Sequence, residues 1–229
     1  SKILNEAEAT VVILSAKVAS VAIVFGLVPG FAVAWLLARG RFRGKSLLQA
    51  IITLPLVLPP VVTGYGLLLL FGTKGPLGSL LENTFGIVFA FRWTGAALAA
   101  AVMAFPLMVR PIQLSIEAAD PGLEDAARTL GASRVMTFLT VLLPLALPGV
   151  IAGAILAFAR AMGEFGATIT FVANIPGQTQ TMSLAIYSLL QSPTGDVAAF
   201  RLILFSIVLS VLAIIASEWF ARRLARKRG

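Results

Sequence analysis

Five long apolar blocks constrain this chain more than any other feature of its sequence. They lie at about residues 18–38, 47–71, 87–109, 150–172 and 202–221, and a helix needs roughly 20 apolar residues to cross a bilayer. Only 12% of the residues are charged, against about 25% in an ordinary soluble domain. The sequence therefore predicts an all-α integral membrane protein with about five transmembrane helices. It excludes a soluble globular enzyme and an outer-membrane barrel, whose strands alternate in polarity.

The residue types that are missing exclude several chemistries. The 229 residues include no cysteine and no histidine, which excludes a thiol nucleophile, a histidine base and metal sites built from thiolate or imidazole ligands. We expect no catalytic residue and no metal. The net charge of +8 would suggest nucleic acid in a soluble domain, but in a membrane protein an excess of lysine and arginine sets orientation. The expected partners are therefore the lipid bilayer and other proteins, with no nucleic acid.

Two basic segments predict the orientation. The link at 39–45 has four positive charges and no negative one. The tail is also basic, with Arg222, Arg223, Arg226, Lys227 and Arg228. Because basic loops stay in the cytoplasm, five spans place the N-terminus outside and the C-terminus inside. The same count places 110–149 in the cytoplasm and 173–201 outside.

The chain contains no linker, internal repeat or low-complexity tract that would divide it. We therefore expect residues 1–229 to form a single transmembrane domain. A lone five-span chain encloses a pathway poorly, which predicts a homodimer. A sixth apolar run at 182–190 is too short to span the bilayer, and we interpret it as a surface or re-entrant helix.

The long cytoplasmic segment carries the signals of a short polar helix. Asp120 is a good N-cap and Pro121 a good first residue. Glu124 and Asp125 lie in or just after the first turn, where the helix dipole favours negative charge. Gly131 can end the helix in a left-handed conformation. We expect about ten helical residues here.

A second, amphipathic segment follows this polar helix. Ser133 is its candidate cap, and Pro144 and Pro148 are expected to interrupt it before the fourth span. The polar helix itself cannot enter the membrane. On helix signals alone, a solvated connector between two spans fits as well as a functional loop.

The spacing within this loop, residues 117–144, resembles the cytoplasmic EAA loop of ABC importer permeases. Asp125-Ala126-Ala127 is followed after three residues by Gly131 and after nine more by Val141-Leu142-Leu143-Pro144. The family pattern is Glu-Ala-Ala, three residues, Gly, nine residues and Ile-x-Leu-Pro. The two departures, aspartate for glutamate and valine for isoleucine, are conservative.

Other segments are similar to the permease subunit of molybdate/tungstate ABC importers. These segments are 54–62, 126–132, 163–171 and 174–177. Sulfate/thiosulfate permeases share the loop and a similar Gly-Glu-(Phe/Tyr)-Gly stretch. The resemblance implies a type I ABC importer permease in the bacterial inner membrane that transports molybdate or tungstate, with sulfate or thiosulfate as the alternative cargo.

The resemblance also implies partners. In this family the loop helix docks into a groove of a cytoplasmic ATPase, and two ATPases drive two permease copies. The coupling residues it implies are Glu124, Asp125, Ala126, Ala127, Arg128 and Gly131. An extracytoplasmic molybdate-binding protein is expected to dock on the outer segments 73–86 and 173–201. The chain has no Gly-x-x-x-x-Gly-Lys-Ser/Thr loop, so we expect no cofactor in this chain and ATP with magnesium on the ATPase.

Charges and prolines within the spans are further candidates for pathway or packing roles. Arg160 and Glu164 are four residues apart, on one helix face, and charges at membrane depth usually face protein or a water-filled cavity. We favour an ion pair that locks packing over a pathway role, because a neutralised arginine attracts an oxyanion weakly. The remaining candidates are the helix-bending Pro55, Pro59 and Pro60 and the hydroxyls of Thr53, Thr63, Thr168 and Thr170. Threonine in a transmembrane helix more often bonds its own backbone.

Two other functional classes share this composition. An ATP-independent channel or secondary carrier gives no reason for a polar cytoplasmic loop with this spacing. An intramembrane enzyme is disfavoured because histidine and cysteine are absent and Asp120, Asp125 and Asp196 all lie outside the predicted spans.

Overall fold

The computed structural model describes residues 5–226, and these residues form helices joined by short segments, without a β-strand. The all-α prediction is confirmed. The predicted tail charges Lys227 and Arg228 lie outside the described residues. The helices are α1 (Glu6–Arg39), α2 (Lys45–Val57), α3 (Pro60–Phe71), α4 (Pro76–Phe85), α5 (Trp93–Ala118), α6 (Pro121–Thr129), α7 (Arg134–Thr137), the π-helical η1 (Phe138–Leu142), α8 (Leu143–Met162), α9 (Gly166–Val172), α10 (Met182–Leu190) and α11 (Asp196–Arg226).

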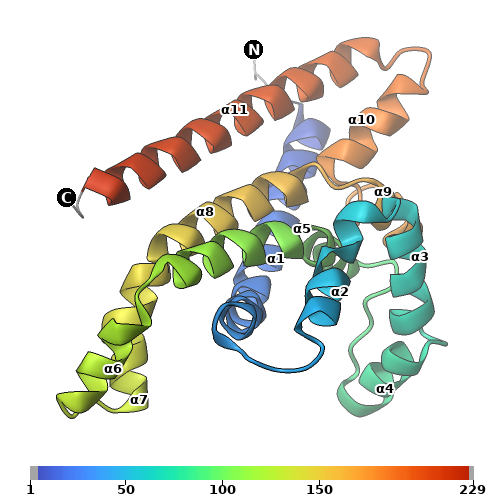
Figure 1. Ribbon diagram of the computed structural model, residues 1–229. Helices are drawn as coiled ribbons and strands as arrows, with labels where there is room; N and C mark the ends of the chain where they lie inside the picture. Colours follow the sequence, from blue (N-terminus) through green and yellow to red (C-terminus); the bar gives the residue numbers. More distant parts are fainter. Residues whose placement is uncertain (1–4, 227–229) are drawn as a thin grey trace.

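Helices α1, α5 and α8 pack against one another at the centre of the molecule (Figure 1). Small residues let them approach closely, as is usual between membrane helices. A Cβ atom on Gly153 of α8 would lie 2.6 Å from the carbonyl oxygen of Met108 in α5. The buried face of α5 is rich in alanine, including Ala96, Ala100 and Ala104. The centre is therefore built on close backbone contact.

The number of spans agrees with the prediction. Among the described residues, four helices are long and apolar enough to cross a membrane, and a bent pair makes up to five. The bent pair is α2 with α3, which meet at 114°. The bend is at Leu58–Pro59, and Pro55 lies inside α2. The prolines of the second predicted span therefore do bend it, at one point.

Two predicted span boundaries are wrong. The third predicted span, 87–109, is shifted to α5, because the chain turns at Phe91, with a left-handed φ of 58°, before the helix begins. The fourth, 150–172, stops at Met162. Gly163 ends α8 there, and α9 follows as a separate short helix after the break at 163–165.

Pro144 and Pro148 do not interrupt the segment that precedes the fourth span, contrary to expectation. The π-helical turn η1 comes just before Pro144, and the amide of Leu143 donates to the carbonyl of Phe138, five residues back. A wider turn accommodates proline because the hydrogen bonding there already departs from the α-helical pattern. The helix consequently runs for 29 residues, Arg134–Met162.

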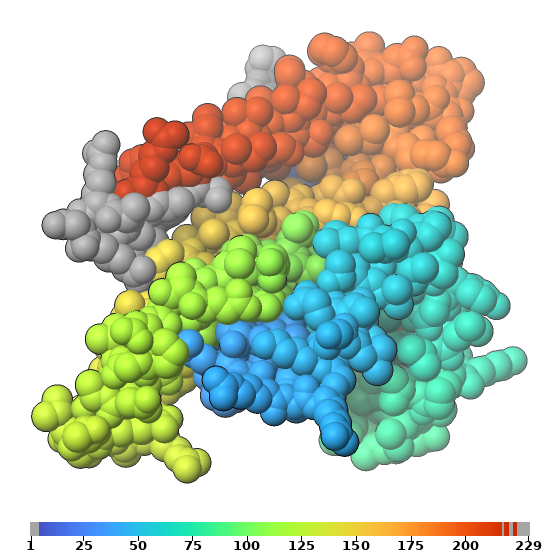
Figure 2. Space-filling model, viewed as in Figure 1, coloured from blue at the N-terminus to red at the C-terminus, as the bar shows by residue number. Residues whose placement is uncertain are grey.

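The first residues of α10 and of α11 are attached to the N-terminal half of α1. Arg201 Nη2 in α11 lies 2.6 Å from Oε1 of Glu8, whose side chain is buried. The amide of Met182, at the start of α10, donates to Oγ of Ser15 over 2.6 Å. The predicted short helix at 182–190 is confirmed as α10. Beyond these contacts, α11 extends along one edge of the molecule (Figure 2).

Candidate coupling loop and helix breaks

The loop helix α6 has the ends that the sequence predicts. Asp120 is its N-cap and accepts a hydrogen bond of 2.8 Å from the amide two residues on, and Pro121 is its first residue. Gly131 has a φ of +92°, the left-handed conformation in which a side chain would be strained. Ser133 caps α7 through its hydroxyl. The predicted caps of the polar helix and of the segment after it are therefore confirmed.

The predicted coupling residues lie on α6, which projects from the bundle (Figure 1), except Gly131, which lies in the turn after it. No residue of α6 is buried, although Glu124 and Ala127 are partly covered. Exposed apolar side chains accompany them: Leu123, Leu130, Val135 and Met136 are 48%, 89%, 67% and 56% exposed. Several exposed apolar residues within one loop are a candidate contact surface for another protein. The helix signals in the sequence do not single out these side chains, although an apolar Leu130 directly before the turn glycine indicates an exposed apolar residue.

Arg39, the last residue of α1, attaches this loop to the bundle. Its Nη2 donates to the carbonyl of Ala119 over 2.8 Å and lies 3.3 Å from Oε1 of Glu124. Glu124 therefore faces the bundle, whereas its neighbour Asp125 is exposed. In the sequence, Arg39 is distinguished only as one charge of the basic link at 39–45. Its position one residue before a helix-ending glycine was the available signal for a structural contact.

The threonine candidates differ in their surroundings. The hydroxyls of Thr53 and Thr170 donate to carbonyls in their own helices, over 2.8 and 2.7 Å. Thr168 is buried. Oγ1 of Thr63, near the start of α3, is buried without a hydrogen-bond partner within residues 5–226. The Thr63 hydroxyl is therefore not used by its own helix, in contrast to those of Thr53 and Thr170.

Arg160 and Glu164 form the ion pair that we favoured. Arg160 Nη1 lies 2.6 Å from Glu164 Oε2, and the glutamate side chain is only 2% exposed. The expected geometry was wrong in one respect, because α8 ends at Met162 and Glu164 lies in the break beyond it. Its other oxygen, Oε1, accepts a hydrogen bond of 2.9 Å from the amide of Ala167 in α9. The carboxylate thus joins two helices.

The two helix breaks lie side by side. A Cβ on Gly166, the first residue of α9, would lie 2.7 Å from Cβ of Pro60, the first residue of α3. A Cβ on Gly64 would lie 2.8 Å from Cα of Ala167 and 2.9 Å from Cβ of Thr170. Helices α3 and α9 therefore pack backbone to backbone. The structure brings together the bend of the second span and the interruption of the fourth.

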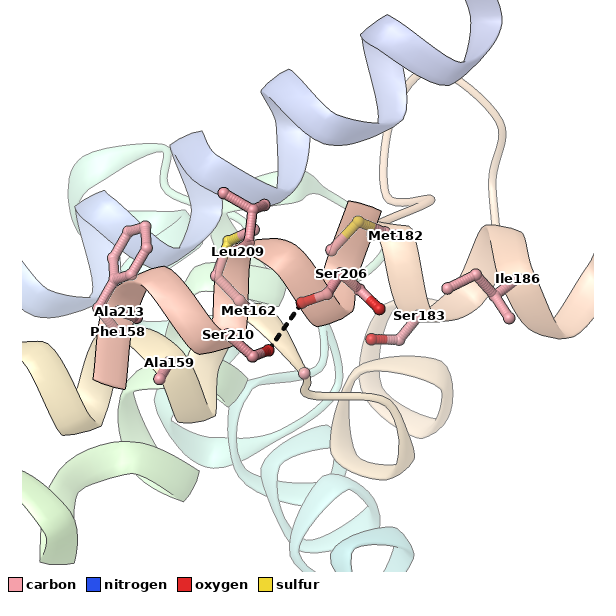
Figure 3. Close-up of a pocket in the computed structure, with 11 residues that line it drawn as sticks. Phe158, Ala159, Met162, Met182, Ser183, Ile186, Ser206, Leu209, Ser210 and Ala213 are labelled. Carbon is pink, nitrogen blue, oxygen red and sulfur yellow. Dashed lines mark hydrogen bonds between the residues drawn. The ribbon is translucent and has the colours of Figure 1, made fainter. Parts of the chain in front are cut away.

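A small cavity of about 170 Å³ lies on the other side of the α8 end, between α8, α10 and α11 (Figure 3). Ser183, Ser206 and Ser210 contribute its hydroxyls. Those of Ser206 and Ser210 donate to carbonyls of their own helix, both over 2.8 Å. The walls are otherwise mainly apolar. Within the described part of the chain, no group of three or more acidic side chains is placed to hold a metal ion.

Comparison with known proteins places these features in a family. Residues 22–226 match the family described as "binding-protein-dependent transport system inner membrane component". The chain is 55% identical to the molybdenum transport system permease protein ModB of Escherichia coli K12, over 99% of this chain and 98% of the relative. ModB of Haemophilus influenzae is 52% identical over 97% of each chain. The sulfate transport system permease protein CysT of Salmonella typhimurium is 41% identical over 86% of this chain and 73% of the relative.

Solved structures of low sequence identity share the fold. A bacterial ABC transporter for the import of alginate has a TM-score of 0.73 at 16% identity, over 96% of this chain and 80% of that one. The inward-facing methionine ABC transporter MetNI has a TM-score of 0.70 at 17% identity, over 96% and 99%. The fold is that of type I ABC importer permeases.

Proposed function

The chain belongs to the family of binding-protein-dependent transport system inner membrane components, and we propose that it is the permease subunit of an ATP-driven molybdate importer. It is a multi-pass protein of the inner membrane. The observation that carries the proposal is the projecting helix α6, which has the capped ends and exposed apolar neighbours of a docking element. A helix of this kind needs a partner protein on the cytoplasmic side.

The proposed cytoplasmic partner is an ATPase subunit, which supplies the ATP and magnesium site that the sequence lacks. Asp125, Ala126, Ala127, Arg128 and Gly131 would contact it. Glu124 would instead hold the loop to α1 through Arg39. Closure of two ATPases would then move two copies of α6, one from each permease of a homodimer.

The proposed outer partner is an extracytoplasmic binding protein that delivers the oxyanion. The segments expected to receive it, 73–86 and 173–201, contain α4 and α10. Selection of the cargo would rest mainly with that binding protein. The support for molybdate over sulfate is that ModB of Escherichia coli and of Haemophilus influenzae are 55% and 52% identical to this chain, above the CysT sulfate permease and the ModB of Mycobacterium tuberculosis, each 41% identical.

Uptake of labelled molybdate tests this proposal. The chain is expressed with its ATPase and binding protein, with and without excess sulfate. Uptake that requires the ATPase and persists in sulfate supports the proposal. Loss of molybdate uptake in excess sulfate would identify sulfate as the cargo. Uptake without the ATPase would exclude an ABC importer.

Gly131→Asp tests the coupling role of the loop. A side chain at this left-handed position is strained, so the end of α6 should lose its geometry while the transmembrane helices still insert. We expect normal amounts of the protein in the membrane and at least a tenfold loss of uptake, measured with labelled molybdate. The matched control is Ser133→Asp, which introduces the same side chain into the same loop and keeps a capping oxygen. An aspartate at Gly66 would instead place a charge within a predicted span. Normal uptake by Gly131→Asp would contradict the coupling role.

A further inference from the structure

A buried carboxylate joins the last turn of α8 to α9, and we propose that Glu164 is the positioning residue that transmits movement of the loop to the α3–α9 pair. The inference rests on the proposed function, because it names the route by which movement at the ATPase contact reaches the membrane interior.

The first step is a continuous helix. α7, η1 and α8 form one helix of 29 residues, Arg134–Met162, that begins just after the turn at Gly131. At 1.5 Å per residue it is about 43 Å long, and the hydrocarbon core of a bilayer is about 30 Å thick. A displacement of the loop is therefore carried across the membrane to the last turn of α8, where Arg160 lies.

The second step is the carboxylate itself. Oε2 of Glu164 lies 2.6 Å from Nη1 of Arg160 in α8, and Oε1 accepts the amide hydrogen of Ala167 in α9 over 2.9 Å. One side chain thus joins the two helices across the break, in addition to the three-residue peptide link 163–165. Because the carboxylate is 2% exposed, breaking either contact leaves a buried charge with lost partners, which is costly. The two helix ends are expected to move together.

The third step is the contact between α9 and α3. Gly64 and Gly166 let the two backbones touch, so α3 cannot shift without α9. Thr63, whose hydroxyl has no hydrogen-bond partner in the described part of the chain, lies in the first turn of α3. Movement of α8 therefore reaches the bent second span through Glu164. Tyr187 of α10 also contacts the break, through the ring of Phe165 at 5.0 Å, but this contact does not join α8 to α9.

The test uses the complete transporter, reconstituted in proteoliposomes with its ATPase and binding protein, and measures molybdate imported per ATP hydrolysed. Wild-type protein must first show ATP-dependent import, and its failure to do so would count against the proposed function alone. Glu164→Gln keeps an acceptor for the Ala167 amide but loses the charge opposite Arg160. We expect near-normal ATP hydrolysis with at least tenfold less molybdate per ATP. Tyr187→Leu, the matched control at the same break, should keep the wild-type ratio.

The double variant Arg160→Gln/Glu164→Gln separates transmission from simple stability. If the pair only avoids an unpaired buried charge, removing both charges should restore the wild-type ratio, which would overturn the proposal. We expect the double variant to remain uncoupled, because the charged contact that ties α8 to residue 164 is still missing. Wild-type stoichiometry in Glu164→Gln would also overturn it. The proposal would also be overturned if neither Glu164→Gln nor Arg160→Gln accumulated in the membrane, because the pair would then be required for folding.

Discussion

Helices α5 and α11 are both long enough to cross a membrane, yet the more apolar of the two is the less buried. The most apolar 18-residue window of α5 has a mean hydropathy of 1.7 and is 61% buried, whereas that of α11 has 2.6 and is 11% buried. In a water-soluble protein, burial favours the most apolar residues. In a bilayer the surrounding lipid is as apolar as leucine, so helices associate through small residues that pack closely. Hydropathy therefore indicates contact with lipid, and small residues indicate contact with protein.

The largest expected effect is that of Gly153→Leu, at the closest approach of α8 to α5. The new side chain would meet the backbone of Met108, with the first atom already 2.6 Å from its carbonyl oxygen. Because backbone cannot move aside as a flexible side chain does, we expect no folded protein to accumulate in the membrane. Gly66→Leu, where a Cβ meets nothing within 4 Å, is the control and should accumulate normally. Equal amounts of the two variants would contradict the close packing of α5 and α8.

Truncating one large side chain in each helix tests the comparison directly. Met103 in α5 is 2% exposed and Leu212 in α11 is 56% exposed. Met103→Ala leaves a cavity and should lower the free energy of unfolding by about 2–5 kcal/mol. Leu212→Ala removes no packed contact of this size, and we expect a change within about 0.5 kcal/mol. Thermal unfolding of the purified variants in the same detergent measures both, and similar losses would mean that α11 is packed after all.

A smaller effect is expected from the ion pair that attaches α11 to α1. Glu8→Gln removes the charge that Arg201 contacts at 2.6 Å. Because the arginine side chain is 46% exposed, water compensates part of the loss, and we expect about 1–2 kcal/mol. The control Glu218→Gln breaks an exposed pair with Arg222 and should change stability by less than about 0.5 kcal/mol. A larger loss in the control than in Glu8→Gln would contradict the assigned attachment.

Local rules were enough to predict the loop helix. The N-cap Asp120, the first residue Pro121 and the left-handed Gly131 each depend on residues within one turn, so sequence determines them directly. The number of spans followed from the lengths of the apolar blocks. The bend of the second span followed from its prolines, although three prolines gave no way to choose Leu58–Pro59 over Pro55.

The break after α8 could not be predicted in the same way. The block at 150–172 has no proline, and its local signals, Gly163 and Gly166, also occur inside membrane helices, so they do not by themselves predict an interruption at 163–165. The interruption is set by Glu164, which caps α9 while paired with Arg160, and by the contact of Gly166 with Pro60, about a hundred residues earlier in the chain. The π-helical turn before Pro144 is a similar case. The prolines by themselves predict a break, but the wider turn lets the helix continue past Pro144.

The contact between Glu8 and Arg201 has a consequence for the order in which the protein is completed. The two residues are 193 positions apart, so at 5–20 residues per second Glu8 is synthesised roughly 10–40 s before its partner exists. By residue 162 the ribosome has already made every helix of the α1–α5–α8 centre. Helix α1 is therefore made well before its contact with α11 can form, and Glu8 has no Arg201 to pair with until α11 has been synthesised.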